Sequence, residues 1–114
     1  MITFLCKKIS KEDLIRCAFA LNKTEYNLLI FLSKKEDKYT ASQISELMKL
    51  DRTTIQKAIK NLVDKKIVKR TQQNISGGGY TFLYTLLDKK ELKEKIKGVV
   101  KRWCEGVEKS INEL

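Results

Sequence analysis

The stretch that most constrains the fold is residues 51 to 63, DRTTIQKAIKNLV. Its apolar residues recur at the spacing of one face of an α-helix: Ile55, Ala58, Ile59 and Leu62. Asp51 is a favourable N-cap, because its carboxylate can accept hydrogen bonds from the free N–H groups of the first helical turn. We therefore predict a helix over residues 52 to 63 that buries one edge in a core.

The opposite edge of this predicted helix carries amide, hydroxyl and cationic side chains. They are Arg52, Thr53, Gln56, Lys57 and Lys60. Such donors match base edges and phosphate oxygens in a DNA major groove. A solvated helix whose charges have no partner would show the same pattern in isolation. The rest of the chain must therefore decide between these two interpretations.

The charge distribution favours a polyanionic partner. The net charge is +10, and residues 49 to 73 hold eight cationic side chains against Asp51 and Asp64, a net charge of +6. The eight are Lys49, Arg52, Lys57, Lys60, Lys65, Lys66, Lys69 and Arg70. A lysine-rich thermophile surface would also contain many lysines, but it would not concentrate them around one helix. The clustering therefore indicates nucleic-acid binding.

Composition limits the class of protein. A chain of 114 residues, 42% hydrophobic and 33% charged, fits one folded domain over residues 1 to 114. No segment is long and apolar enough to span a membrane, and the start, MITFLCKK, does not have the charge order of a signal peptide. Histidine is absent, which excludes a Ser–His–Asp or Cys–His catalytic arrangement. We expect a cytoplasmic protein without a cofactor or metal that is not an enzyme.

Capping signals divide the first half of the chain into helices. Ser10 and Asp13 resemble a capping box that opens a helix over residues 11 to 21, and Thr24 suits the N-cap of a second helix over residues 25 to 34. We thus place the N-terminal helices in residues 10 to 35, after a short arm. The core candidates are Leu14, Cys17 or Ala18, Leu21, Tyr26, Leu28, Leu29, Phe31 and Leu32.

A second capping box, Thr40 with Gln43, starts a helix over residues 41 to 48. It should bury Ile44, Leu47 and Met48. Two short helices with a tight connection, the second one amphipathic and basic, form a helix-turn-helix over residues 40 to 63.

The periodicity then changes from helical to extended. Residues 67 to 73 and 80 to 86 are rich in β-branched and aromatic residues and flank NISGGG, which predicts a hairpin with a glycine tip. Phe82, Tyr84 and Leu86 should share one face of this hairpin. A helix-turn-helix followed by a hairpin makes a winged helix, with residues 67 to 86 as the wing on the DNA backbone or in the minor groove.

A last helix is predicted over residues 88 to 112, opened by Asp88 and Glu91. Its apolar stripe consists of Leu92, Ile96, Val99, Trp103, Val107 and Ile111, with Leu114 beyond. An apolar stripe of this length would be exposed to water unless another helix packs on it, and a two-fold homodimer is the commonest way in which such a surface is buried. The alternative is that the stripe folds back on the first helix of the same chain.

Three stretches resemble a known family: CAFALNKTEYNLLIFLSK, SQISELMKLDRTTIQKAIKNLVDKKIVKR, and GGGYTFLYTLLD followed by a helix with KRW. They are similar to the small archaeal winged-helix transcription regulators of the TrmB-like group, related to MarR-type regulators, over about residues 6 to 107. The resemblance implies a mainly α fold with a small β-hairpin, a winged helix-turn-helix whose terminal helices form a dimer on operator DNA. Lys49 and Lys66 stand where such proteins often have glycine at positive φ.

The expected partner is therefore double-stranded DNA, bound sequence-specifically by a homodimer. Arg52, Thr53, Gln56 and Lys57 would face base edges. Phosphates would be held by Thr40, Ser42, Thr54, Lys60, Lys69 and Arg70. The sequence does not identify a small-molecule effector.

Two alternatives stay open. One is a winged helix that binds only protein, as in transcription or chromatin machinery. The other is a thiol-responsive regulator, because Cys6, Cys17 and Cys104 lie at the two ends of the chain that would meet in the dimer. Their number is odd and their spacing is unlike that of a metal site. Buried cysteines acting as small apolar residues are the simpler interpretation.

Overall fold

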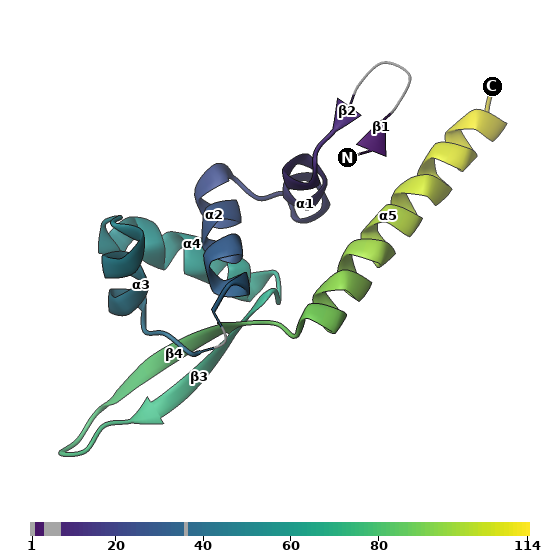
Figure 1. Ribbon diagram of the computed structural model, residues 1–114. Helices are drawn as coiled ribbons and strands as arrows, with labels where there is room; N and C mark the ends of the chain where they lie inside the picture. The colour runs from purple at the N-terminus through teal and green to yellow at the C-terminus, as the bar shows by residue number, and fades with distance from the viewer. Residues whose placement is uncertain (1, 4–7, 36) are drawn as a thin grey trace. The chain divides into compact units, whose positions relative to one another are not determined.

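A computed structural model of the chain describes residues 2–3, 8–35 and 37–114. The elements follow in the order β1 (Ile2–Thr3), β2 (Lys8–Ile9), α1 (Lys11–Phe19), α2 (Lys23–Ser33), α3 (Ala41–Met48), α4 (Arg52–Asp64), β3 (Val68–Asn74), β4 (Tyr80–Leu86) and α5 (Lys89–Asn112) (Figure 1). The mainly helical architecture with an antiparallel hairpin confirms the predicted fold class. The chain divides into two compact units, one formed by residues 1–22 with 88–114 and the other by residues 23–87. A single domain over residues 1 to 114 stays a prediction.

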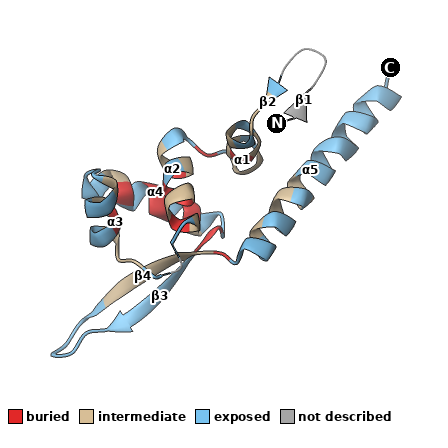
Figure 2. Ribbon diagram, viewed as in Figure 1, coloured by how far each residue is buried: buried red, intermediate tan, exposed pale blue. Residues whose placement is uncertain are grey.

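The unit of residues 23–87 is built around buried apolar side chains from α2, α3 and α4 and from residues at the inner end of the hairpin. Buried residues gather on α2 and α4, as Figure 2 shows. The largest fully buried side chains are Leu28, Leu29, Leu32, Ile44, Ile55, Leu62 and Ile67. The α4 stripe predicted from periodicity, Ile55 with Ala58, Ile59 and Leu62, lies entirely in this core. Burial of that stripe turns the polar edge of α4 to the outside.

One expected core position and one expected helix cap in this unit are wrong. Leu47 was expected inside, but 55% of its surface is exposed at the last turn of α3. Helix α2 begins at Lys23, so Thr24 lies within the helix and is not its N-cap. The connection from α1 therefore lies two residues earlier than predicted, at residues 20–22 instead of 22–24.

The connection between α3 and α4 is a tight left-handed turn. Lys49 ends α3 with φ 57°, and Asp51 caps α4. At the other end of α4, Lys66 has φ 61° and leads into β3. Both lysines thus adopt the conformation that suits glycine, as the resemblance implied.

Strands β3 and β4 form the predicted hairpin. The register pairs Val68 with Leu86 and Asn74 with Tyr80. Because side chains alternate along a strand, Phe82, Tyr84 and Leu86 share one face. Tyr39 adds a backbone bridge to Tyr84 at the inner end. Beyond that bridge the hairpin extends past the helices of its own unit (Figure 1).

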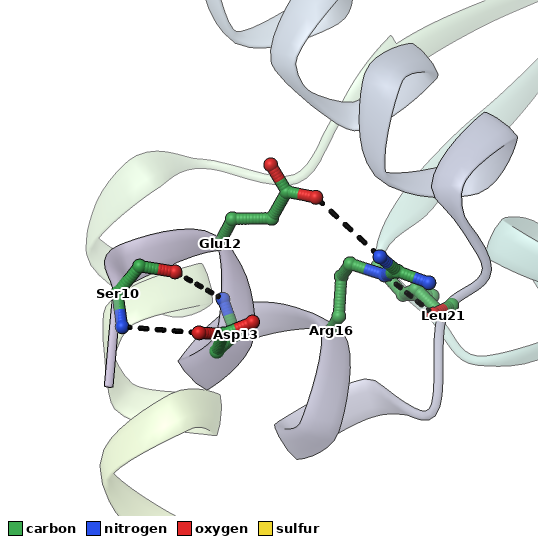
Figure 3. A network of polar contacts seen from close by, with 5 residues as sticks. All are labelled: Ser10, Glu12, Asp13, Arg16 and Leu21. Atoms are coloured by element: carbon green, nitrogen blue, oxygen red, sulfur yellow. Dashed lines mark hydrogen bonds and ion pairs between the residues drawn. The ribbon is translucent and has the colours of Figure 1, made fainter. Parts of the chain in front are cut away.

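The other unit contains the short strands and two helices. Ser10 and Asp13 form the predicted capping box of α1 (Figure 3). At the opposite end of α1, Arg16 donates from Nε to the carbonyl oxygen of Leu21 at 3.2 Å and pairs with Glu12 at 3.4 Å. The hydrogen bond from Arg16 to Leu21 spans Ala20, which ends α1 with a positive φ of 53°.

Three expectations for this unit are corrected by the structure. Ile15 is the buried residue of α1, whereas Leu14 is half-buried and Cys17 is exposed. Residues 2–3 and 8–9 pair as antiparallel strands where only an arm was expected. Asp88 precedes α5 but makes no side-chain capping hydrogen bond. Helices α1 and α5 contact each other within the unit.

Candidate nucleic-acid interface

The outward edge of α4 is the centre of the candidate interface. Five side chains on this edge are exposed: Arg52, Thr53, Gln56, Lys57 and Lys60. Helical spacing places them one, four, five and eight residues after the first, so they line one side over two turns. The opposite side holds the buried stripe. The structure therefore brings together the predicted base-reading residues and the predicted phosphate contact Lys60.

The first turn of α4 is closed by its own cap. Asp51 accepts a hydrogen bond from the backbone N–H of Thr54 at 3.0 Å and another from the Thr54 hydroxyl. The hydroxyl bond, followed by the backbone bond, lowers the pKa of the Asp51 carboxyl below its ordinary value of 3.8. Asp51 is thus ionised at neutral pH, and the hydroxyl proton of Thr54 is engaged. Thr54 positions the start of α4, and its hydroxyl is a poor donor to phosphate.

The start of α3 presents two further predicted contacts. The Thr40 hydroxyl oxygen accepts from the N–H of Gln43 at 3.1 Å, and the Gln43 side chain accepts from the N–H of Thr40 at 2.9 Å. The hydroxyl proton of Thr40 has no part in this capping box. Ser42, two residues after Thr40, is exposed. Helices α3 and α4 pack together, so both residues belong to the same helix-turn-helix as the α4 edge.

Two polar contacts that hold α4 were not found from the sequence. Ser45 donates its hydroxyl to the carbonyl oxygen of Leu50, while the N–H of Leu50 donates to the carbonyl oxygen of Ser45 at 3.2 Å. Asn61 on α4 donates to the carboxylate of Glu25 on α2. Glu25 is only 3% exposed. The first contact fixes the turn, and the second ties the far half of α4 to α2.

The base of the hairpin carries the last two predicted phosphate contacts. Lys69 and Arg70 are both exposed, but as neighbours in β3 they project from opposite faces. The Arg70 guanidinium lies over the ring of Phe82, 4.5 Å from its centre. A cation at this distance is attracted to the aromatic face, which limits the orientations of the arginine. The structure does not bring Lys69 and Arg70 to one surface.

The predicted dimerisation stripe lies along α5. Leu92, Ile96 and Val99 are half-buried, whereas Trp103, Val107 and Ile111 are 56%, 39% and 59% exposed. A shallow apolar hollow on the second half of the helix is lined by Trp103, Gly106, Val107, Ser110, Ile111 and Leu114. The stripe is therefore covered only along the first part of α5.

The thiols and other reactive groups add little chemistry. Cys17 and Cys104 are exposed free thiols, so for these two the expectation of burial is wrong, and Cys6 lies outside the described residues. In residues 2–3, 8–35 and 37–114 no three His, Cys, Asp or Glu side chains are grouped to hold a metal ion.

Among the helices of the described part, none is long and apolar enough to cross a bilayer.

Comparison with known proteins identifies the family. A profile of the DnaD N-terminal domain matches residues 13–106. The chain belongs to the DnaD N-terminal domain family. The narrower expectation of a TrmB-like regulator stays a prediction.

Relatives extend over nearly the whole chain. An uncharacterised protein of Methanocaldococcus jannaschii, MJ1503, is 30% identical over 109 residues, which cover 96% of this chain and 82% of the relative. The solved structure of a possible transcriptional regulator from Methanosarcina mazei is 32% identical and has a TM-score of 0.92, covering 99% of this chain and 95% of the other. A MarR transcriptional regulator from the same organism shares the fold with a TM-score of 0.57 at 24% identity, over 84% and 66% of the two chains.

Proposed function

We propose that this member of the DnaD N-terminal domain family is a sequence-specific regulator of transcription that binds double-stranded DNA as a homodimer. Helix α4 would enter the major groove and the hairpin would lie beside it. The observation that carries the proposal is the exposed donor edge of α4, opposite a fully buried stripe. The positive charge around α4 and the similarity to a possible transcriptional regulator support it.

The roles of the α4 side chains follow from their chemistry. Gln56 can form two hydrogen bonds with adenine, and Arg52 or Lys57 can donate to guanine. Lys60 lies further along the helix and offers a point charge to phosphate. Ser42 and Thr40 would add hydroxyl contacts to the backbone. Thr54, whose proton is engaged by Asp51, would act through the orientation of α4.

The decisive experiment separates specific from non-specific binding. Purified protein is used to select bound fragments from the source genome, and affinity for the best fragment is measured between 50 and 200 mM salt. We expect Lys60→Ala to weaken binding to all duplexes and to lower the salt slope by about 0.9. Gln56→Ala should instead reduce the preference for the selected sequence over random DNA.

The control is Lys101→Ala, which removes the same charge from α5. Lys101 is exposed on the side of that helix opposite Trp103, so the slope should stay at the wild-type value. Unchanged binding in both α4 variants would reject the interface. Weak binding that ignores sequence would favour the protein-interaction module instead.

Homodimerisation through α5 would cover the second half of its apolar stripe. We expect a dimer in sedimentation equilibrium and an operator with two related half-sites about one DNA turn apart. Trp103→Glu or Ile111→Glu should produce monomers, whereas the matched change Lys101→Glu on the opposite side should not. Wild-type protein that is monomeric at micromolar concentration, or Glu variants that stay dimeric, would reject this arrangement.

The exposure of Cys17 and Cys104 keeps a thiol-responsive variant of the regulator as a second proposal. Peroxide would oxidise two thiols to one disulfide and be reduced to water. We expect operator affinity to change on oxidation in the wild type and to stay constant in a Cys17→Ser, Cys104→Ser double variant. An operator affinity that peroxide leaves unaltered would reject the sensor.

A further inference from the structure

The hairpin differs in charge from the rest of the chain. Residues 71 to 87 contain no Asp, Glu, Lys or Arg, although a third of all residues are charged. The next longest uncharged stretch, residues 26 to 33, lies in α2, where burial of Leu28, Leu29 and Leu32 explains it. Residues 71 to 80, by contrast, are all exposed. Burial therefore does not account for the missing charges of the hairpin.

We call residues 71–80 the outer wing. Three consecutive amide side chains lie at the end of its first strand: Gln72, Gln73 and Asn74. At the tip Ile75 is 50% exposed, and on the returning strand Tyr80 is 57% exposed. Strand alternation places Gln73 on one face and the other two amides on the opposite face. Each face of the outer wing thus offers amide donors and acceptors, next to apolar surface.

The tip is also slender. Gly77, Gly78 and Gly79 have φ values of 95°, 110° and 84°, a conformation that side chains other than hydrogen rarely allow. A Cβ at any of the three would meet no atom within 4 Å, so packing does not require glycine there. Glycine is required there by the positive φ values. As a result, no side chains project from the tip of the hairpin at these three positions. Such a loop suits a minor groove that is about 6 Å wide.

These properties do not suit a phosphate clamp. Side chains that neutralise phosphates are Lys and Arg, and they make affinity strongly dependent on salt. The two cations of the hairpin, Lys69 and Arg70, lie at its base, before the outer wing begins. Proteins that bind the minor groove distinguish A·T from G·C pairs with Arg, Lys, Asn or Gln side chains and often insert apolar residues there, and the outer wing carries the amide and apolar members of this set.

We propose that the outer wing enters the minor groove of DNA flanking the α4 site and prefers A·T pairs there. Gln72, Gln73 and Asn74 supply the hydrogen bonds, and Ile75 contacts the floor of the groove. This inference rests on the proposed function, since it requires α4 to dock on duplex DNA. In this arrangement α4 and the base of the hairpin provide the salt-dependent part of the affinity. The outer wing adds discrimination between A·T and G·C pairs that does not depend on salt.

The test uses the full chain and four duplexes that carry the selected α4 site. Their flanks contain A·T, G·C, inosine·cytosine or 2,6-diaminopurine·thymine pairs at the positions protected by the wing. Inosine·cytosine has the minor-groove groups of an A·T pair and the major-groove groups of a G·C pair. Diaminopurine·thymine adds to an A·T pair the minor-groove amino group that guanine carries.

We expect the A·T and inosine·cytosine flanks to bind equally well. The G·C and diaminopurine flanks should bind more weakly, by about 5- to 100-fold. A Gln73→Ala, Asn74→Ala double variant should lose most of this discrimination and keep the wild-type salt slope. Lys60→Ala is the matched control, because it should lower the slope and keep the discrimination.

Each other outcome has a defined meaning. Equal affinity for all four flanks, or inosine·cytosine behaving like G·C, would overturn the outer-wing inference while Lys60→Ala still confirms docking by α4. Loss of salt slope in the amide variant would overturn it as well, since it would indicate phosphate contacts. If the wild type binds no duplex, the proposed function fails, and the inference fails with it.

Discussion

The contact between Asn61 and Glu25 provides a quantitative test of how α4 is held. Glu25 is 3% exposed, and its carboxylate accepts a hydrogen bond from the Asn61 side-chain amide at 2.5 Å, across 36 positions of sequence. A hydrogen bond to a charged group contributes about 1.5 to 3 kcal/mol. Asn61 itself is exposed, so Asn61→Ala removes little apolar burial and isolates the polar contribution.

Alanine is more favourable than asparagine in a helix by roughly 0.6 kcal/mol, which offsets part of the lost hydrogen bond. We therefore expect Asn61→Ala to lower the free energy of unfolding by about 1 to 2.5 kcal/mol. The midpoint of thermal unfolding should fall by about 4 to 10 °C. Urea denaturation followed by circular dichroism at a fixed protein concentration measures the change. Asn27→Ala is the matched control, because Asn27 is an exposed asparagine of α2. It should be neutral or slightly stabilising.

A second background completes the test. In a Glu25→Leu protein Asn61 no longer has a carboxylate to donate to. Asn61→Ala should therefore not lower the free energy of unfolding any further in that background, because replacing both partners of a buried polar pair is often neutral. The reasoning would be refuted if Asn61→Ala behaved like Asn27→Ala in the wild type. It would equally be refuted if the cost were the same with and without Glu25.

Three further predictions concern turns and caps. Lys66→Gly should raise the free energy of unfolding by up to about 1 kcal/mol, because φ is 61° there, whereas Lys65→Gly, at φ −83°, should lower it in the same urea assay. The cap formed by ionised Asp51 stabilises the protein fully above pH 3.8, and this contribution is lost as pH falls through the lowered pKa. Thermal melts of wild type and Asp51→Ala should therefore differ at pH 7, and the difference should shrink as the pH falls below 3.8. Arg16→Ala removes the donor to Leu21 and should speed amide hydrogen exchange in residues 20 to 22, while a wild-type rate there would contradict the contact.

Local patterns predicted the helices well. The buried stripe of α4 follows from its 3.6-residue period, and the capping boxes at Ser10 and Thr40 form as their sequences indicate. These signals are local, because a cap or a stripe is set by residues three or four positions apart. The same reasoning placed the exposed donor edge of α4 opposite its core.

Contacts that depend on distant parts of the chain escaped prediction. Nothing near Glu25 indicates that a carboxylate would be buried against Asn61, since only tertiary packing brings α2 and α4 together. Leu47 lies three residues after Ile44 on α3, yet Ile44 is buried and Leu47 is exposed. The site residues Lys69 and Arg70 were grouped by charge, but strand alternation separates them.

The cap of α4 has a consequence for competition by small molecules. A helix start ordinarily attracts sulfate, nucleotides and similar anions, because its N–H groups are unoccupied. In this protein the negatively charged carboxylate of Asp51 occupies that position and accepts from the N–H of Thr54. We therefore expect free phosphate compounds to bind weakly at the start of α4, because the Asp51 carboxylate repels them and already accepts from the N–H of Thr54.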